Sequence, residues 1–374
     1  MTIRRLTSDD IRPGERLAWD VFGENGALLV RKGFTPSSEA QVDSIVQRGY
    51  VDDASPCVAS VKARAASVEP PSVLRLLNHA VAELEPLLHR IAAGGGGVQA
   101  ELEQVALLVE EAVEINAEVA AACILHNQRA APYAIRHCID TAVVAQILAR
   151  AVKRPVIERQ SMSLAALTMN VGMLRLQDDR CVLSTEEKAL VRNHPEQGVA
   201  LLRQAGVTDP LWLDCVLSHH ENENGSGYPR ALVGDAIAFP AKLIALADRY
   251  CARVSDRPYR KPMLPNAALR DILLDARQAL DAQLGAVLIR ELGIYPVGTF
   301  VRLLNGEVGV VSRRGLNSTT PYVQSFIGPR GAPLDVFLQR DTRGELSGIR
   351  DVLRAEQVDG SIRMDQVWGK AALP

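Results

Sequence analysis

The chain has 374 residues, of which 47% are hydrophobic and 23% are charged, a balance typical of a globular protein that buries a core. Its 42 basic and 44 acidic side chains give a net charge of −2, which offers no electrostatic basis for binding nucleic acid or an anionic membrane surface. The length favours two or three domains, and six cysteines without a Cys-x-x-Cys pair indicate buried thiols in a reducing compartment.

The first residues lack the apolar stretch of a signal peptide. No uncharged apolar run reaches the roughly 18 residues that span a bilayer. We therefore expect a cytoplasmic protein with neither a membrane nor a nucleic acid as its partner.

Residues 1–58 are predicted to form a small α/β module. The segment LAWDVFGENGALLVRKG has the pattern of a hairpin, strand, turn and strand, with the turn from Gly23 to Gly26. The following SSEAQVDSIVQRGYV predicts a short helix that stops at Gly49. Residues 59–72 combine small and charged residues and end beside two prolines, which predicts a linker.

Helical periodicity starts at residue 73. Apolar residues recur at spacings of three and four through residues 73–125, with an interruption at GGGG, residues 94–97. This pattern predicts a helical arm, either an antiparallel pair or an arm that dimerises. We interpret His79 and His89 on this arm as surface or boundary residues, not metal ligands.

Helices are predicted to dominate residues 126–296, where STEE at 184–187 has the form of a capping box. Strand alternation then returns around an Asn305-Gly306 hairpin turn, so residues 297–374 are predicted to be a β-rich C-terminal extension. The predicted fold class is mainly α: a helical bundle with a small N-terminal α/β module and a C-terminal β extension.

The segment HHENENGSGYP, residues 219–229, has the composition of a metal site. Neighbouring helical residues point about 100° apart, so His219 and His220 can serve one site only if it is broad. A pair of metals about 3.5 to 4 Å apart meets that need. One buried and one exposed histidine at a helix end is the alternative interpretation.

Two further features are charged: an aspartate in an apolar helical run and a turn with two arginines. Asp248 lies inside the apolar run AKLIALADRY, where a carboxylate is costly to bury unless it is paired or bound to a cation. An ion pair with one of the nearby arginines is the other interpretation. Arg257 and Arg260, in SDRPYR, form a basic turn that either holds a phosphate or is simply a solvated surface turn.

In chain order these motifs resemble the HD-GYP family of cyclic di-GMP phosphodiesterases. HHENENGSGYP is similar to the family signature HHE-x-x-DGSGYP, ALADRYCARVSDRPYR is similar to its Asp and DRPYR segment, and NHPEQG carries its middle His-Pro and Gly. The resemblance covers about residues 126–300 and implies an HD-domain helical bundle. It also implies a cluster of iron or manganese ions that activates a bridging water for attack on the phosphodiester phosphorus.

The resemblance assigns roles to particular residues. The family's metal ligands correspond to His137, His194, His219, His220 and Asp248. Its phosphate-contacting pair corresponds to Arg257 and Arg260, and Tyr133 stands where members with three metals have a glutamate. The GYP loop, here Gly227, Tyr228 and Pro229, is implied to dock diguanylate cyclase (GGDEF) domains.

The resemblance breaks at LTMNVGM, residues 167–173, where the family has a stretch like LLHDIGK. Met169 replaces the histidine, Asn170 replaces the aspartate and Met173 replaces the lysine. A neutral amide cannot bridge two cations as a carboxylate does, and a thioether is a soft ligand that suits Fe(II) or Mn(II) poorly. The metal that His137 and Asp248 help to hold in the family has therefore lost two of its four protein ligands.

We therefore expect a catalytically impaired HD-GYP protein that is not an enzyme and carries no metal. It would be a sensor or adaptor in cyclic di-GMP signalling, with cyclic di-GMP as its ligand. The alternative is an active phosphodiesterase with one iron or manganese ion at His194, His219 and His220, and with His126 as a substitute ligand. Reuse of the scaffold outside cyclic di-GMP signalling is the third interpretation.

Overall fold

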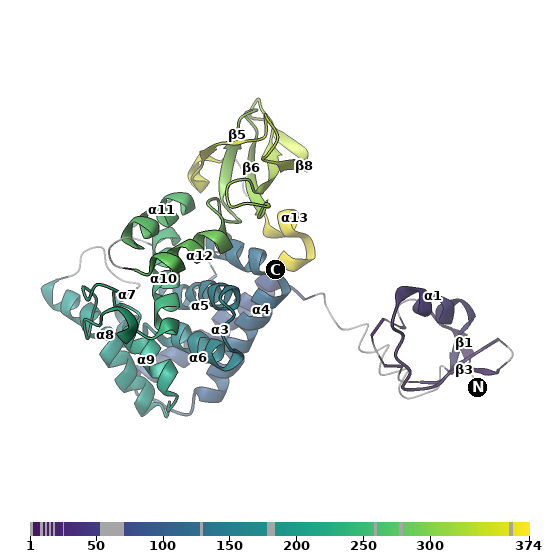
Figure 1. Cartoon of the computed structure of the whole chain (residues 1–374), viewed down its shortest axis with the longest axis horizontal. Helices are drawn as coiled ribbons and strands as arrows, with labels where there is room; N and C mark the ends of the chain where they lie inside the picture. Colours follow the sequence, from purple (N-terminus) through teal and green to yellow (C-terminus); the bar gives the residue numbers. More distant parts are fainter. Residues whose placement is uncertain are drawn as a thin grey trace. The chain divides into compact units, whose positions relative to one another are not determined.

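The computed structural model describes residues 3–7, 10–11, 13–14, 16–17, 19–24, 26–52, 71–127, 130–177, 184–257, 260–276, 280–358 and 362–374. The chain divides into two compact units, Met1–Pro70 and Pro71–Pro374, each of which is drawn in Figure 1. Residues 59–70 of the predicted linker lie outside the described residues. The boundaries between the five predicted segments stay predictions.

The smaller unit has the elements expected of an α/β module. Its strands pair in the order β1-β4-β2-β3 and are β1 (Ile3–Arg5), β2 (Val21–Phe22), β3 (Leu28–Val30) and β4 (Tyr50–Asp52). Helix α1 (Glu39–Arg48) is capped by Ser38 and ends at Gly49, as predicted. The β2–β3 hairpin is also confirmed, and the unit buries a small core of its own around Trp19 and Val21.

The larger unit is mainly helical. Its long helices are α3 (Val73–Ala92), α4 (Gln99–His126), α5 (Tyr133–Ala151), α6 (Val156–Thr168), α8 (Thr185–Gln204), α9 (Pro210–Ser218), α10 (Phe239–Val254), α11 (Pro265–Ala276) and α12 (Ala282–Leu292). The shorter ones are η1 (Val171–Met173), α7 (Leu174–Gln177) and η2 (Gly234–Ala236). Every residue of α5 from Tyr133 to Ala149 is buried, so α5 is the central helix of the bundle.

Helices α3 and α4 are separated by the glycine run at 94–97, as predicted, and they contribute to the same apolar core as α5. Helix α4 is broken at Asn116, where φ is −162° and ψ is 98°. The side-chain oxygen of Asn116 accepts hydrogen bonds from the backbone N–H groups of Glu118 (3.0 Å) and Val119 (3.1 Å). Asn116 therefore caps the second half of α4.

The C-terminal extension contains a five-stranded antiparallel sheet with strand order β8-β7-β6-β5-β9. Its elements are β5 (Phe300–Leu303), β6 (Val308–Arg313), β7 (Tyr322–Ile327), β8 (Pro333–Asp341), β9 (Ile349–Val352), η3 (Ala355–Gln357), α13 (Met364–Trp368) and η4 (Gly369–Ala372). The predicted Asn305-Gly306 turn joins β5 to β6, with Gly306 at a φ of +90° that favours glycine. The predicted β-rich character is confirmed.

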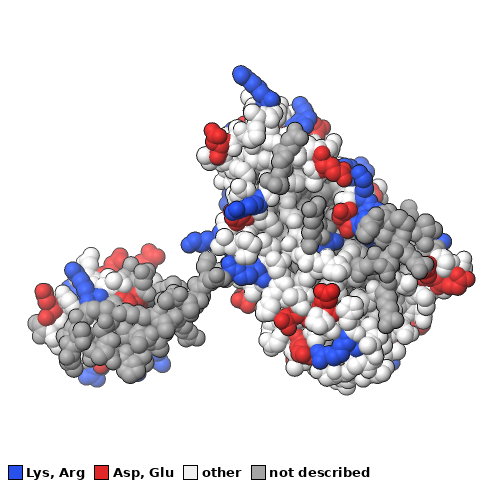
Figure 2. All heavy atoms as spheres, turned by 180° about the vertical axis from the view of Figure 1, so that it is seen from behind, with Lys and Arg blue, Asp and Glu red and all other residues white. Residues whose placement is uncertain are grey.

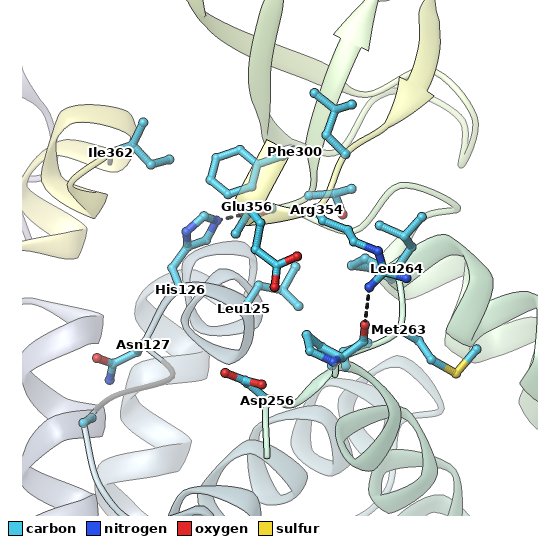
Figure 3. A pocket seen from close by; sticks show the side chains of 18 of the residues that line it. Leu125, His126, Asn127, Asp256, Met263, Leu264, Phe300, Arg354, Glu356 and Ile362 are labelled. Atoms are coloured by element: carbon cyan, nitrogen blue, oxygen red, sulfur yellow. Dashed lines mark hydrogen bonds between the residues drawn. The ribbon is translucent and has the colours of Figure 1, made fainter. Parts of the chain in front are cut away.

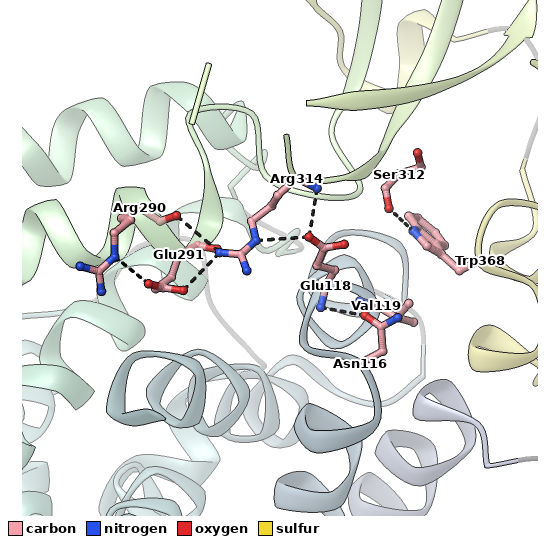
Figure 4. A network of polar contacts seen from close by, with 8 residues as sticks. All are labelled: Asn116, Glu118, Val119, Arg290, Glu291, Ser312, Arg314 and Trp368. Atoms are coloured by element: carbon pink, nitrogen blue, oxygen red, sulfur yellow. Dashed lines mark hydrogen bonds and ion pairs between the residues drawn. The ribbon is translucent and has the colours of Figure 1, made fainter. Parts of the chain in front are cut away.

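Arg314, just after β6, connects the sheet to α4 and α12 through hydrogen bonds (Figure 4). Its backbone N–H and Nε donate to Glu118 Oε1 at 3.0 and 3.2 Å, and its Nη1 donates to the backbone oxygen of Glu291 on α12 at 2.8 Å. Within the extension itself, Trp368 Nε1 donates to the backbone oxygen of Ser312 at 2.8 Å. The extension is therefore attached to two different helices by charged and polar contacts.

The surface agrees with the near-neutral composition. On the face shown in Figure 2, side chains of both signs are scattered among uncharged ones. None of the helices that the structure describes is long and apolar enough to cross a membrane. Four cysteines are buried and free, namely Cys123, Cys138, Cys215 and Cys251. Cys57 and Cys181 lie outside the described residues.

Candidate functional site

The five residues singled out as possible metal ligands meet in the centre of the bundle. His137 comes from α5, His194 from α8, His219 and His220 from the end of α9, and Asp248 from α10. His137 Nε2 lies 2.8 Å from Asp248 Oδ1, and His220 Nδ1 lies 4.0 Å from Asp248 Oδ2. His194 Nε2 and His219 Nε2 are 3.1 Å apart. The structure thus brings all five side chains together.

The backbone fixes the protons of two of these histidines. His194 Nδ1 lies 2.6 Å from the oxygen of Val191, and His219 Nδ1 lies 2.7 Å from the oxygen of Val216. A carbonyl oxygen only accepts, so each Nδ1 carries a proton and each Nε2 of a neutral ring presents a lone pair. Burial lowers the pKa of His194 to about 3 and also lowers the pKa of His219. Two lone pairs therefore face each other, an arrangement that a cation between them would stabilise.

We call His194, His219 and His220 the histidine trio. Each offers one nitrogen, and the three nitrogens lie within 4.8 Å of one another. Burial lowers the pKa of His220 well below its ordinary value, so all three rings favour the neutral form that binds metals. Imidazole suits zinc, copper, iron and nickel. The donor set of the trio therefore fits one metal ion.

The other half of the site that the resemblance implies consists of His137 and Asp248 with Met169 and Asn170. Met169 is fully buried, and Asn170 is 2% exposed. The turn that follows them touches α8, because a Cβ on Gly172 would lie 2.3 Å from the backbone oxygen of His194. Asn170 Oδ1 is buried and has no hydrogen-bond partner among the described residues. A thioether and an uncharged amide do not fit a second hard cation.

Asp248 is paired inside this half of the site. Burial alone would raise its pKa, but the hydrogen bond with His137 and the electrostatic influence of the surrounding histidines hold the pKa of Asp248 well below its usual range. The nearby arginines that were the alternative partners bind elsewhere: Arg249 donates to Asn222, and Arg253 donates to Asp275 at 2.7 Å. His137 is therefore the hydrogen-bond partner of Asp248.

The basic turn lies next to His137. The guanidinium carbon of Arg257 is 4.3 Å from the centre of the Tyr133 ring, and the Tyr133 ring stacks on His137 at 5.1 Å. Arg257 Nη2 donates to the backbone oxygen of Ala252 at 2.9 Å, while its buried Nε has no partner among the described residues. Arg260 is exposed and pairs with Arg257 through their backbones. The guanidinium group of Arg257 is thus held over Tyr133, close to His137.

The GYP loop packs on the histidine trio. A Cβ on Gly227 would lie 2.4 Å from the nitrogen of Asn222 and 2.6 Å from the oxygen of His220, so only glycine allows this close approach. The ring centres of Tyr228 and His220 are 4.7 Å apart, and the guanidinium carbon of Arg192 lies 5.4 Å from the centre of the Tyr228 ring. Sequence reasoning missed Arg192, which no motif marks. The docking role of Gly227, Tyr228 and Pro229 stays a prediction.

His126 does not lie at this site. Its Nε2 is 2.7 Å from the backbone oxygen of Gly298, and its ring contacts Phe300 at 5.1 Å and Trp368 at 5.7 Å. The idea that His126 replaces a lost ligand is therefore wrong. His126 instead connects the end of α4 to the C-terminal extension.

Residues 114–284 match the HD domain family, and all five converging ligand candidates fall within this stretch. This part of the chain is an HD domain, and the predicted membership of the HD-GYP family is confirmed. The cyclic di-GMP phosphodiesterase PA4108 of Pseudomonas aeruginosa is 32% identical over 203 residues, which cover 53% of this chain and 49% of that protein. The cyclic di-GMP phosphodiesterase PdeB of Borreliella burgdorferi is 22% identical over 237 residues, which cover 61% of this chain and 62% of that protein.

A third relative acts on a different nucleotide by its name: the 3'3'-cGAMP-specific phosphodiesterase 3 of Vibrio cholerae is 28% identical over 169 residues, 44% of this chain and 36% of that protein. Among solved structures, Bd1817, a HDG"Y"P protein from Bdellovibrio bacteriovorus, aligns with a TM-score of 0.49 at 14% identity and covers 77% of this chain and 97% of that chain. The chain spans about half the length of PA4108 and less than two thirds of PdeB.

Proposed function

We propose that this protein is a catalytically impaired HD-GYP protein that binds cyclic di-GMP without hydrolysing it and acts as a sensor or adaptor in cyclic di-GMP signalling. One observation carries the proposal: the half of the site that includes the buried Met169 and Asn170 has Asp248 as its one carboxylate among the implied ligands, and Asp248 is hydrogen-bonded to His137. Hydrolysis by two metals needs both cations held in place, with an anionic group between them. With Met169 and Asn170 in place of an imidazole and a carboxylate, this half of the site lacks the anionic group that would bridge the two cations.

The basic turn supports a binding role. Arg257 stacks on Tyr133, which itself stacks on His137, and guanidinium groups favour phosphate oxygens. The relatives named as phosphodiesterases of cyclic di-GMP and of 3'3'-cGAMP support a cyclic dinucleotide as the ligand. We propose a diguanylate cyclase domain as the protein partner, with Tyr228 and Pro229 of the GYP loop as the contact.

Titration calorimetry tests the binding role. Wild-type protein is expected to bind cyclic di-GMP without product formation, and Arg257→Ala is expected to weaken binding by about tenfold or more because a charge-assisted hydrogen bond is lost. Arg313→Ala is the matched control, since Arg313 also stacks on a tyrosine, Tyr322, at 4.3 Å, but in the β extension. No binding by the wild type would refute the sensor role, and turnover would refute the impairment.

A second candidate is a phosphodiesterase with one metal, and the lone pairs of His194 and His219 that face each other favour it. The trio would hold the ion, which when bound supplies Lewis acidity and a water of lowered pKa. His194 and His219 are already oriented for this by the carbonyl oxygens that accept from their Nδ1 atoms.

Metal content separates the two candidates. For the second candidate, protein purified without oxygen and reconstituted with iron or manganese is expected to retain about one ion per chain, and His219→Ala is expected to lose both the ion and any hydrolysis. His79→Ala, with a side chain 59% exposed, is the control. Less than about a tenth of an ion per chain would exclude the second candidate and support the impaired protein.

A further inference from the structure

A groove of about 1070 Å³ separates the turn that carries Arg257 and Arg260 from the C-terminal extension. One wall is formed by the chain around this turn, including Asp256, Pro262 and Met263, and the opposite wall is formed by Arg354 and Glu356. In Figure 3 a single dashed line crosses between these walls, from the guanidinium group of Arg354. Arg354 lies outside the matched HD domain, so this contact joins the domain to another part of the chain.

Backbone hydrogen bonds hold the turn that carries Arg257 and Arg260 at its base, beside α10, and near its tip. At the base, Met263 N–H donates to the backbone oxygen of Arg253 on α10 at 2.8 Å. Near the tip, the backbones of Arg257 and Arg260 donate to each other at 3.3 and 3.2 Å, which are long hydrogen bonds. Neither of these ties connects the turn to anything beyond α10. Helix α5 contacts the turn through Arg136, which donates to the backbone oxygen of Asp256 at 3.3 Å, and through Tyr133 beneath Arg257. Lys261 and Pro262, between base and tip, make the contacts with the C-terminal extension.

Of the two contacts between the turn and the extension, the hydrogen bond from Arg354 is the stronger. Its Nη1 donates to the backbone oxygen of Pro262 at 2.8 Å, with Pro262 only two residues after Arg260. Lys261 Nζ lies 3.3 Å from Glu356 Oε1, but both side chains are more than 60% exposed, so this ion pair adds little. On its own side, Arg354 is held by a hydrogen bond from its backbone N–H to Gln357 Oε1 at 2.9 Å.

We propose that Arg354 is a positioning residue through which the C-terminal extension sets the affinity of Arg257 and Arg260 for the phosphates of a cyclic dinucleotide. The inference rests on the proposed function of these two arginines. A turn already fixed in its binding conformation loses less conformational freedom when the ligand binds, and so binds more tightly. Without the contact to Pro262, the segment between base and tip would lose its hydrogen bond to the extension, and the long hydrogen bonds between Arg257 and Arg260 would be less well supported.

The test compares three variants by titration with cyclic di-GMP. Arg354→Ala is expected to weaken binding about three- to tenfold, which is the range for the loss of one hydrogen bond. Arg354→Lys keeps a donor and is expected to restore most of the affinity. Arg350→Ala is the matched control, because Arg350 is on the same extension and pairs only with its neighbour Asp351, at 2.9 Å, in the described residues. Thermal melting confirms that each variant is folded.

Amide hydrogen exchange gives a result that does not depend on the ligand. The amides of Arg257, Arg260 and Met263 are expected to exchange faster in R354A than in wild type or R350A. If the wild type does not bind cyclic di-GMP, the proposed function fails while faster exchange still supports the positioning role. Unchanged exchange in R354A overturns the inference, and so does faster exchange with unchanged affinity in a wild type that binds.

Discussion

Replacing Met169 with histidine and Asn170 with aspartate together is expected to add about one metal ion per chain and to produce hydrolysis of cyclic di-GMP. The two positions are buried just before η1, and Asn170 Oδ1 is a buried oxygen without a hydrogen-bond partner among the described residues. The double variant returns an anionic oxygen and an imidazole, the hard and borderline donors that iron and manganese prefer. Metal analysis after anaerobic reconstitution, together with product detection, measures both effects.

The same variant makes a second prediction that needs no activity. Without metal, a buried carboxylate that lacks a partner is expected to lower the free energy of unfolding by about 2 kcal/mol or more. Adding Mn²⁺ is expected to restore stability, because a ligand that binds only the folded state stabilises it by mass action. Met169→Leu is the control, since it keeps the apolar packing and adds no donor.

Unchanged metal content in the double variant would contradict this account. It would mean that LTMNVGM does not lie opposite His137 and Asp248 in the way the family resemblance implies. Restored metal without hydrolysis would instead point to Met173, where the family's lysine is also missing and where a third substitution would then be needed.

Local patterns in the sequence were sufficient to predict the elements whose signals are themselves local. The capping box at Ser184 and Glu187 is present in full, and the stop at Gly49 and the turn at Asn305-Gly306 are where they were expected. Each of these depends on hydrogen bonds or φ angles within a few residues. The break of α4 at Asn116 was not predicted, because Asn116 sits inside a continuous helical pattern of apolar residues.

The site was predicted only as a set of residue identities. The family order of motifs picked out His137 and Asp248, but the direct hydrogen bond between them depends on how α5 packs against α10 across 111 residues of sequence. His126 was misplaced because closeness to His137 in the sequence says nothing of the turn that separates α4 from α5. Arg354 carries no motif, and its partner Pro262 lies 92 residues away.

Replacing Asp140 with asparagine is expected to stabilise the protein at alkaline pH and to do so less at acidic pH. Asp140 lies on α5, one turn after Arg136, and is 6% exposed, with Oδ2 lacking a hydrogen-bond partner among the described residues. Burial raises the pKa of Asp140 from 3.8 to about 7, against the opposing charge of Arg136. The folded protein therefore keeps a proton on this carboxyl that the unfolded chain gives up near pH 4.

The sign of the pH dependence follows from these two values. Below pH 3.8 the carboxyl is neutral in both the folded and the unfolded state, so it does not lower the free energy of unfolding. Between pH 3.8 and about 7 the free energy of unfolding falls as the pH rises, and above about pH 7 it falls no further. A difference of about 3 pKa units lowers the free energy of unfolding by about 4 kcal/mol at pH 8 and by about 2 kcal/mol at pH 5. Asparagine is neutral throughout, so Asp140→Asn removes this loss.

Urea unfolding at pH 5 and pH 8 measures the free energy of unfolding of wild type and Asp140→Asn. The increase caused by the substitution is expected to be about 2 kcal/mol larger at pH 8 than at pH 5. Asp335→Asn is the control, because Asp335 is exposed on β8 and its replacement removes one carboxyl of the same kind from the surface. An equal gain at both pH values would show that Asp140 acts through packing and not through its charge. Because Asp140 shares α5 with His137, a stabilised variant that still binds cyclic di-GMP would also show that this buried carboxyl is not needed for binding.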